Sequence, residues 1–137
     1  MTVERPENLF EGFDPSSYEA EARERWPEEA AAAERFAATL TPADMARMQR
    51  ETTAQIVRMA ELRTAGTPVD APAVQAEIDA LHASISRMWT PNAEAFAALG
   101  RMYVEDERFR ATYDRVAPGV AEYFRDAMAV YAADRPT

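Results

Sequence analysis

The chain has 137 residues, a formal net charge of −9 and no cysteine. This length suits one domain with a single core, and the missing cysteine excludes a disulfide framework, a thiolate nucleophile and a thiolate metal site. Ten acidic residues and four arginines fall in the first 40 positions, and no basic cluster occurs elsewhere, so nucleic-acid binding is disfavoured. No apolar run is long enough for a membrane span, so membrane insertion is disfavoured as well.

The hydrophobic pattern predicts an all-α fold, because apolar residues recur three and four positions apart and no segment alternates as a strand does. Asp14-Pro15 is typical of an N-cap followed by proline at the first helical position, and the helix that begins there should stop at Pro27. A short alanine-rich helix follows to about Ala38, with Phe36 as its large apolar anchor. Both helices are rich in carboxylates and poor in apolar side chains, so we expect their stability to depend on what they pack against.

Two longer helices follow. Thr41-Pro42-Ala43-Asp44 has the spacing of a capping box, with Asp where Glu is usual, and opens a helix that Gly66 should end. After a short turn, a second helix begins near Pro72, so the two should pack antiparallel. Their apolar stripes are Met45, Met48, Ile56, Met59 and Leu62 on the first, and Val74, Ile78, Leu81, Ile85 and Met88 on the second.

Three further helices complete the predicted set of seven. Thr90-Pro91 should start the first of them, and Glu105-Asp106-Glu107 should separate it from a shorter helix. Pro118-Gly119 precedes the terminal helix. The chain is predicted to divide into a disordered leader, one domain and a tail, at residues 1–8, 9–133 and 134–137.

Few side chains are suited to catalysis or metal binding. His82 is the sole histidine and lies beside the apolar stripe of its helix, as either a packed or surface histidine or a polar contact inside a pocket. A metal site would need carboxylates to complete its ligand set, and no metal-binding spacing occurs. The triplet Glu105-Asp106-Glu107 is either a catalytic cluster or, as its place between two helices favours, a helix cap. Without nucleophile-elbow or nucleotide-binding motifs, we predict no enzymatic activity, no metal and no cofactor.

Methionine and aromatic side chains are abundant, with seven methionines and thirteen aromatic residues. Met45, Met48, Met59 and Met88 lie on two helices that should face each other, where they either fill the core or line an adaptable pocket. Trp89 lies at a helix end, where the indole is either structural or forms a wall of a ligand site.

Two stretches of sequence resemble a known family. They are Leu9-Phe-Glu-Gly-Phe-Asp-Pro-Ser-Ser-Tyr-Glu-Ala-Glu-Ala-Arg-Glu-Arg-Trp26 and Met102-Tyr-Val-Glu-Asp-Glu-Arg-Phe-Arg-Ala-Thr-Tyr113. They are similar to the opening and closing signatures of the TipAS-type antibiotic-recognition domain, the effector-binding part of TipA-like regulators of the MerR family. Ile85-Ser-Arg-Met-Trp89 and Ala117-Pro-Gly-Val-Ala-Glu-Tyr123 match further segments in the same order. The resemblance extends over almost the whole chain, from about Leu9 to Ala133.

The resemblance implies an all-α, globin-like fold with a deep cleft for bulky antibiotics, which are thiopeptides in the founding regulators and other large aromatic or peptidic compounds in relatives. It also implies that the N-terminal helices are loose without ligand and close over a bound one. Two departures limit the transfer. Thiopeptide-capturing members use a cysteine in the region matching Trp89–Ala95, and this chain has Trp-Thr-Pro-Asn-Ala-Glu-Ala there, so binding should be reversible. No winged-helix domain precedes Leu9, so we expect sequestration of a drug and no direct activation of a promoter.

The sequence therefore favours a cytoplasmic protein that reversibly binds and sequesters a bulky antibiotic or similar natural product. The alternative is a regulatory module that pairs with a full-length MerR-family regulator, and a homodimer is also compatible with the sequence. The residues predicted to contact the ligand are Trp89, Asn92, Phe96, Met45, Met48, His82, Tyr103 and Tyr113.

Overall fold

The computed structural model describes residues 3–10 and 16–134, and within these ranges the regular structure is helical throughout. Its helices are α1 (Ser16–Arg25), α2 (Pro27–Ala37), α3 (Pro42–Thr64), α4 (Pro72–Ile85), α5 (Ala93–Glu105), α6 (Glu107–Asp114) and α7 (Val120–Asp134). The predicted all-α class is confirmed. The predicted cap at Asp14-Pro15 falls outside the described residues.

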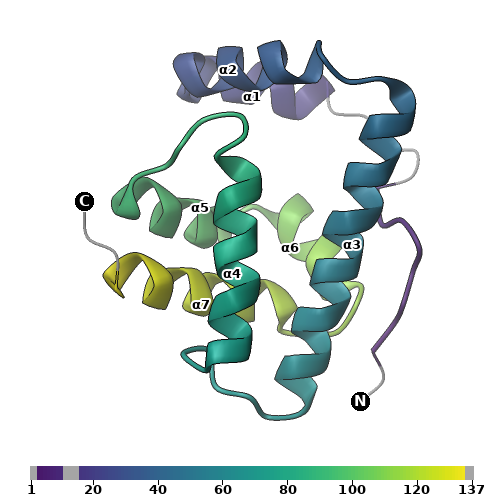
Figure 1. Ribbon diagram of the computed structural model, residues 1–137, viewed down its shortest axis with the longest axis vertical. Coiled ribbons are helices and arrows are strands. Elements are labelled where there is room, and N and C mark those ends of the chain that lie inside the picture. The colour runs from purple at the N-terminus through teal and green to yellow at the C-terminus, as the bar shows by residue number, and fades with distance from the viewer. Residues whose placement is uncertain (1–2, 11–15, 135–137) are drawn as a thin grey trace.

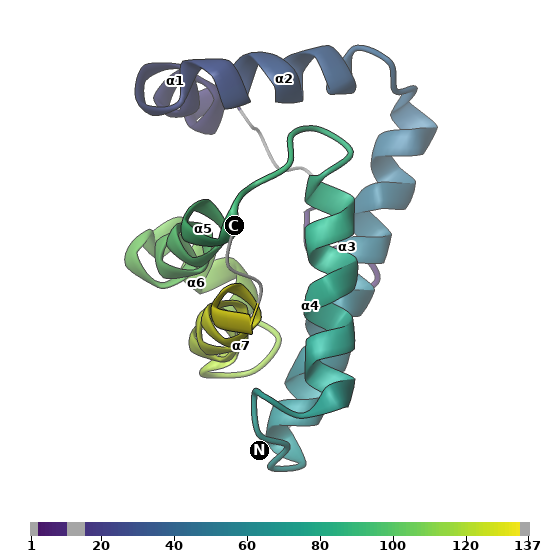
Figure 2. The same cartoon turned by 60° about the vertical axis from the view of Figure 1, so that its left-hand side comes forward.

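The helices form three groups (Figure 1). The antiparallel pair α3 and α4 stands on one side, as predicted, α7 packs against it, and α5 and α6 pack against α7. Helices α1 and α2 lie across the top of the molecule, above α5 (Figure 2). We call this pair of N-terminal helices, residues 16–37, the roof.

Local signals explain where the central helices begin and end. The Thr41 hydroxyl accepts a hydrogen bond from the Asp44 amide at 3.1 Å, and the Asp44 carboxylate accepts one from the Thr41 amide at 3.0 Å, which confirms the capping box. Gly66 has a φ of 80°, a conformation that glycine adopts with little strain, and α3 ends just before it. Asp106 caps α6 by accepting a hydrogen bond from the Arg108 amide at 2.9 Å, so the acidic triplet has the predicted capping role.

Helix α5 begins later than expected. Thr90-Pro91 was predicted to start it, but the chain stays extended until Asn92, whose side chain accepts a hydrogen bond from the Ala95 amide at 2.8 Å. The asparagine cap satisfies an otherwise unpaired amide and therefore defines the first helical residue as Ala93.

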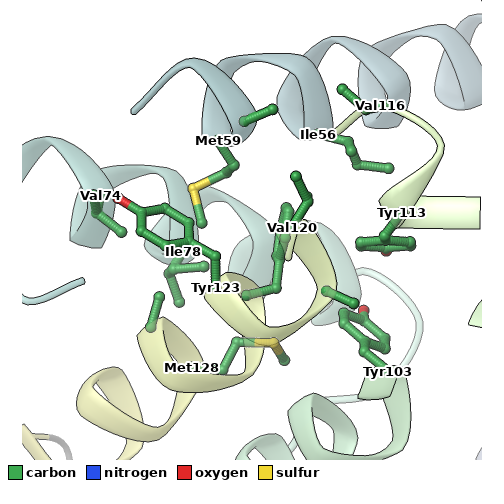
Figure 3. Packing of buried hydrophobic residues seen from close by; sticks show 14 of the residues in the cluster. Ile56, Met59, Val74, Ile78, Tyr103, Tyr113, Val116, Val120, Tyr123 and Met128 are labelled. Atoms are coloured by element: carbon green, nitrogen blue, oxygen red, sulfur yellow. The ribbon is translucent and has the colours of Figure 1, made fainter. Parts of the chain in front are cut away.

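The core lies where α3, α4 and α7 meet, with α5 packed on the other side of α7 (Figure 3). Ile56 and Met59 from α3 and Ile78 from α4 are almost completely buried against Val120 and Met128 of α7. The apolar stripes were predicted correctly in these places. Met45, in the first turn of α3, differs: 41% of its surface is exposed, because the end of α3 extends beyond the other helices of the core.

The predicted division into a leader, one domain and a tail stays a prediction. In the part of the N-terminal segment that the structure describes, residues 3–10, Val3 and Leu9 are both buried. The Glu4 amide donates to the Val116 carbonyl at 2.8 Å, and the Leu9 amide donates to the buried Thr53 hydroxyl at 3.0 Å. These contacts hold residues 3–9 against the core. The tail residues 135–137 lie outside the described part, and Asp134 is the last residue of α7.

Candidate ligand-binding site

A cavity of about 310 Å³ lies between the roof and α5. We call it the roof cavity. Its lining comes from α1, α2, the loop after α4, and α5, and consists of Ala22, Trp26, Glu29, Ala30, Ala33, Trp89, Ala95, Ala98, Leu99 and Met102. The volume is near the lower end of the range for small-molecule sites, and the lining is largely apolar, as such sites usually are.

The cavity exists because alanines line it from both sides. Ala30 and Ala33 of α2 lie on one side, and Ala95 and Ala98 of α5 on the other. Alanine is the strongest helix former and has the smallest side chain with a Cβ, so these positions favour the helical conformation without filling the space between the helices. The alanine-rich sequence of α2, which offers little to a core, is therefore suited to forming a ligand site.

Two indoles lie at this cavity, and they are the only tryptophans of the chain. Trp26 is at the junction of α1 and α2, 39% exposed, with the Arg25 guanidinium 4.6 Å from its ring centroid. Trp89 is half-buried in the loop after α4, and its amide donates to the Ile85 carbonyl at 3.1 Å. Flat aromatic side chains with a polar N–H are suited to stacking on a large planar or peptidic ligand.

Among the side chains that the structure describes, charged groups of the body contact the roof. The Arg108 guanidinium pairs with Glu21 of α1 at 2.6 Å, and it also pairs with Asp106 at 2.8 Å. Hydrogen bonds from Arg108 hold the pKa of Asp106 below its usual value, so the carboxylate stays charged. The Arg87 guanidinium lies 5.2 Å from the Phe36 ring centroid. Exposed contacts of this kind are screened by solvent, so each of them holds the roof weakly.

A second cavity of about 240 Å³ lies at the loop that carries Trp89, near the start of α5. His82, Phe96 and Tyr131 line it, with ring centroids 5.1 Å apart for His82 and Phe96 and 5.5 Å apart for His82 and Tyr131. His82 Nε2 lies 3.2 Å from the Pro91 carbonyl oxygen, which can only accept, so this nitrogen carries the proton. His82 is thus a packed histidine that connects α4 to the loop, and its ring also borders a pocket.

The predicted site residues are distributed among several places. Trp89 lines the roof cavity, whereas His82 and Phe96 line the second cavity. Asn92 caps α5, and Met45 and Met48 lie on α3 outside both linings. Ligand contact by any of the eight stays a prediction.

Tyr103 and Tyr113 lie in the core, with ring centroids 5.0 Å apart, and burial raises the pKa of both phenols. Sequence reasoning did not select Trp26, Glu29 or the alanines of the roof cavity. The available signal was an indole directly before Pro27, followed by an alanine-rich helix that lacked core residues.

No group of three or more His, Cys, Asp or Glu side chains suited to a metal ion occurs in residues 3–10 and 16–134. No helix in the described part is long and apolar enough to cross a membrane.

Residues 18–131 match the TipAS antibiotic-recognition domain. The chain belongs to the TipAS family. Its fold is similar to that of TipAS from Streptomyces lividans in complex with nosiheptide, solved as part of a thiopeptide antibiotic multidrug resistance system. The TM-score is 0.82 and the identity 34%, over 92% of this chain and 90% of that one. This likeness confirms the predicted globin-like all-α class.

Curated relatives of this TipAS-family chain are transcriptional regulators. It is 36% identical to the HTH-type transcriptional regulator SkgA of Caulobacter vibrioides and 36% identical to the HTH-type transcriptional activator TipA of Streptomyces coelicolor. Each match covers 93% of this chain but 54% of SkgA and 52% of TipA, so the chain spans about half the length of these relatives. The family is thus one of recognition domains found in regulators.

Proposed function

We propose that this TipAS-family chain reversibly binds a bulky, largely apolar antibiotic or similar natural product in the roof cavity, between the roof and α5. The observation that carries the proposal is the cavity itself, with an indole from the roof and an indole from the body of the protein in one lining. Membership of an antibiotic-recognition family and the likeness to TipAS with bound nosiheptide support the same function.

The size of the cavity bears on how such a ligand would bind. A space of about 310 Å³ is small for a thiopeptide, so we expect the roof to shift when a large ligand enters. The roof is suited to this movement because exposed contacts such as the Arg108–Glu21 ion pair hold it to the body. Since the chain has no cysteine, capture through a thiol is impossible, and affinity would come from apolar burial and stacking on the indoles.

Intrinsic fluorescence tests the proposal directly, because both tryptophans of the chain line the cavity. Titration with nosiheptide and a panel of other bulky antibiotics should change the emission of the wild-type protein at up to tens of micromolar ligand. The single-tryptophan variants W26F and W89F should each still respond, since each keeps one reporter in the cavity lining, Trp89 in W26F and Trp26 in W89F. Emission that stays constant for the whole panel would contradict the proposal.

A second candidate function is pairing with a full-length regulator of the same family, which the regulator relatives SkgA and TipA favour. It predicts co-purification of this chain with such a regulator in the absence of drug. Drug binding without co-purification would support sequestration alone. Catalysis has no part in either function, and a bound compound should be recovered from the protein with its mass unchanged.

A further inference from the structure

Among the side chains that the structure describes, Glu29 is the one ionisable group in the lining of the roof cavity. It lies in the first turn of α2 and is half-buried. No ion pair or hydrogen bond connects its carboxylate to another side chain in the part of the chain that the structure describes. A charge in an otherwise apolar lining costs desolvation energy unless a partner compensates it, so this position gains from a cationic partner.

Three basic side chains of the roof and its contacts have other partners. Arg25 lies over the Trp26 ring, Arg23 pairs with Glu34 at 2.6 Å, and Arg108 pairs with Glu21 and Asp106. The cavity therefore combines one uncompensated negative charge with two indoles whose ring faces also attract cations. The acidic N-terminal third of the chain adds a long-range attraction of the same sign.

A structural role also exists for this carboxylate. Glu28 and Glu29 both lie in the first turn of α2, where negative charge offsets the helix dipole. Glu28, however, is exposed and does not line the cavity. Glu28 and Glu29 thus have the same effect on the helix dipole, but only Glu29 lies where a ligand in the cavity can contact it.

We propose that Glu29 selects ligands that carry a protonated amine on an aromatic or otherwise apolar body, with the amine at the carboxylate and the body between the indoles of Trp26 and Trp89. This inference rests on the proposed function, because it requires that a ligand occupies the roof cavity. It adds a charge requirement to a site whose remaining lining selects only for apolar character.

The test uses two isosteric probes, 9-(aminomethyl)anthracene, which is cationic at neutral pH, and 9-(hydroxymethyl)anthracene, which is neutral. Isothermal titration calorimetry on the wild-type protein should give a dissociation constant about ten-fold lower for the amine, as a half-exposed charged hydrogen bond predicts. In E29Q the amine should bind about as weakly as the alcohol, and binding of the alcohol should be unchanged. The control E28Q should retain the full preference, since it alters the same helix dipole without altering the lining.

Four outcomes would overturn the inference. Equal affinity of the wild type for the two probes, or a preference that persists in E29Q, removes the role of Glu29 and leaves the proposed function intact. A loss of preference in E28Q equal to that in E29Q assigns the effect to the dipole. If neither anthracene binds the wild type, the inference also fails, and the nosiheptide titration then decides whether the proposed function fails with it.

Discussion

Replacement of Gly119 by alanine tests the turn that joins α6 to α7. Gly119 and Gly66 have similar positive φ values, 86° and 80°, but different surroundings. An alanine Cβ at position 119 would lie 2.7 Å from Cζ and 2.8 Å from Nε of Arg63, whereas at position 66 no atom lies within 4 Å. G119A should therefore combine backbone strain with displacement of a guanidinium, and G66A should show the backbone strain alone.

The magnitudes follow from these two contributions. An alanine in the left-handed region costs about 1 kcal/mol, so G66A should lower the free energy of unfolding by about that amount. At position 119 the Arg63 side chain must also move away and lose its packing, which adds about 1 kcal/mol. For a chain of this length each kcal/mol lowers Tm by about 3 °C, so we expect decreases of about 3 °C for G66A and about 6 °C for G119A.

Urea unfolding of six proteins checks this reasoning: wild type, G66A, G119A, R63A, and both glycine variants in the R63A background. Without the guanidinium, the cost of G119A should fall to that of G66A, giving a coupling energy of about 1 kcal/mol between positions 63 and 119 and none between 63 and 66. An equal cost of G119A in the two backgrounds would refute the steric argument. An increase in stability for G66A would refute the backbone argument.

Two further predictions concern packing and charge. Met128→Ala, which empties a fully buried position on α7, should cost about 2 to 5 kcal/mol in urea unfolding, whereas Met45→Ala, at a side chain that is 41% exposed, should cost about 0.5 kcal/mol or less. A hydrogen bond from Arg58 lowers the pKa of Glu77 from its ordinary 4.5, so the stability from this pair is present above about pH 4.5 and is lost as the pH falls through the lowered value. Glu77→Gln should therefore lose less stability than the wild type between about pH 5 and pH 3, and parallel acid-unfolding curves would contradict the assigned pair.

Sequence reasoning located helices well where the signal was local. The capping box at Thr41 and the glycine at position 66 mark the two ends of α3, because hydrogen bonds and φ angles within a few residues decide them. The predicted start of α5 was less accurate, because the sequence offers two start signals, Thr90-Pro91 and Asn92. The hydrogen bond from the Ala95 amide to the Asn92 side chain favours the start after Asn92. Sequence reasoning did not predict the burial of Val3, because that residue depends on a surface made by helices far along the chain.

The candidate site shows the same division. The two signatures and the absence of cysteine, both read from residues alone, already indicated the family and reversible binding. The roof cavity was decided by tertiary structure, because Trp26, Trp89 and the alanines of α2 and α5 belong to separate segments and line one space only after the helices pack. Periodicity reports which side of a helix is apolar, and it does not report whether the facing helix fills the gap. Tyr103 and Tyr113 therefore lie in the core, and Glu29 lies in the cavity lining. The geometry between helices determines what each of these side chains faces, and no local sequence pattern encodes that geometry.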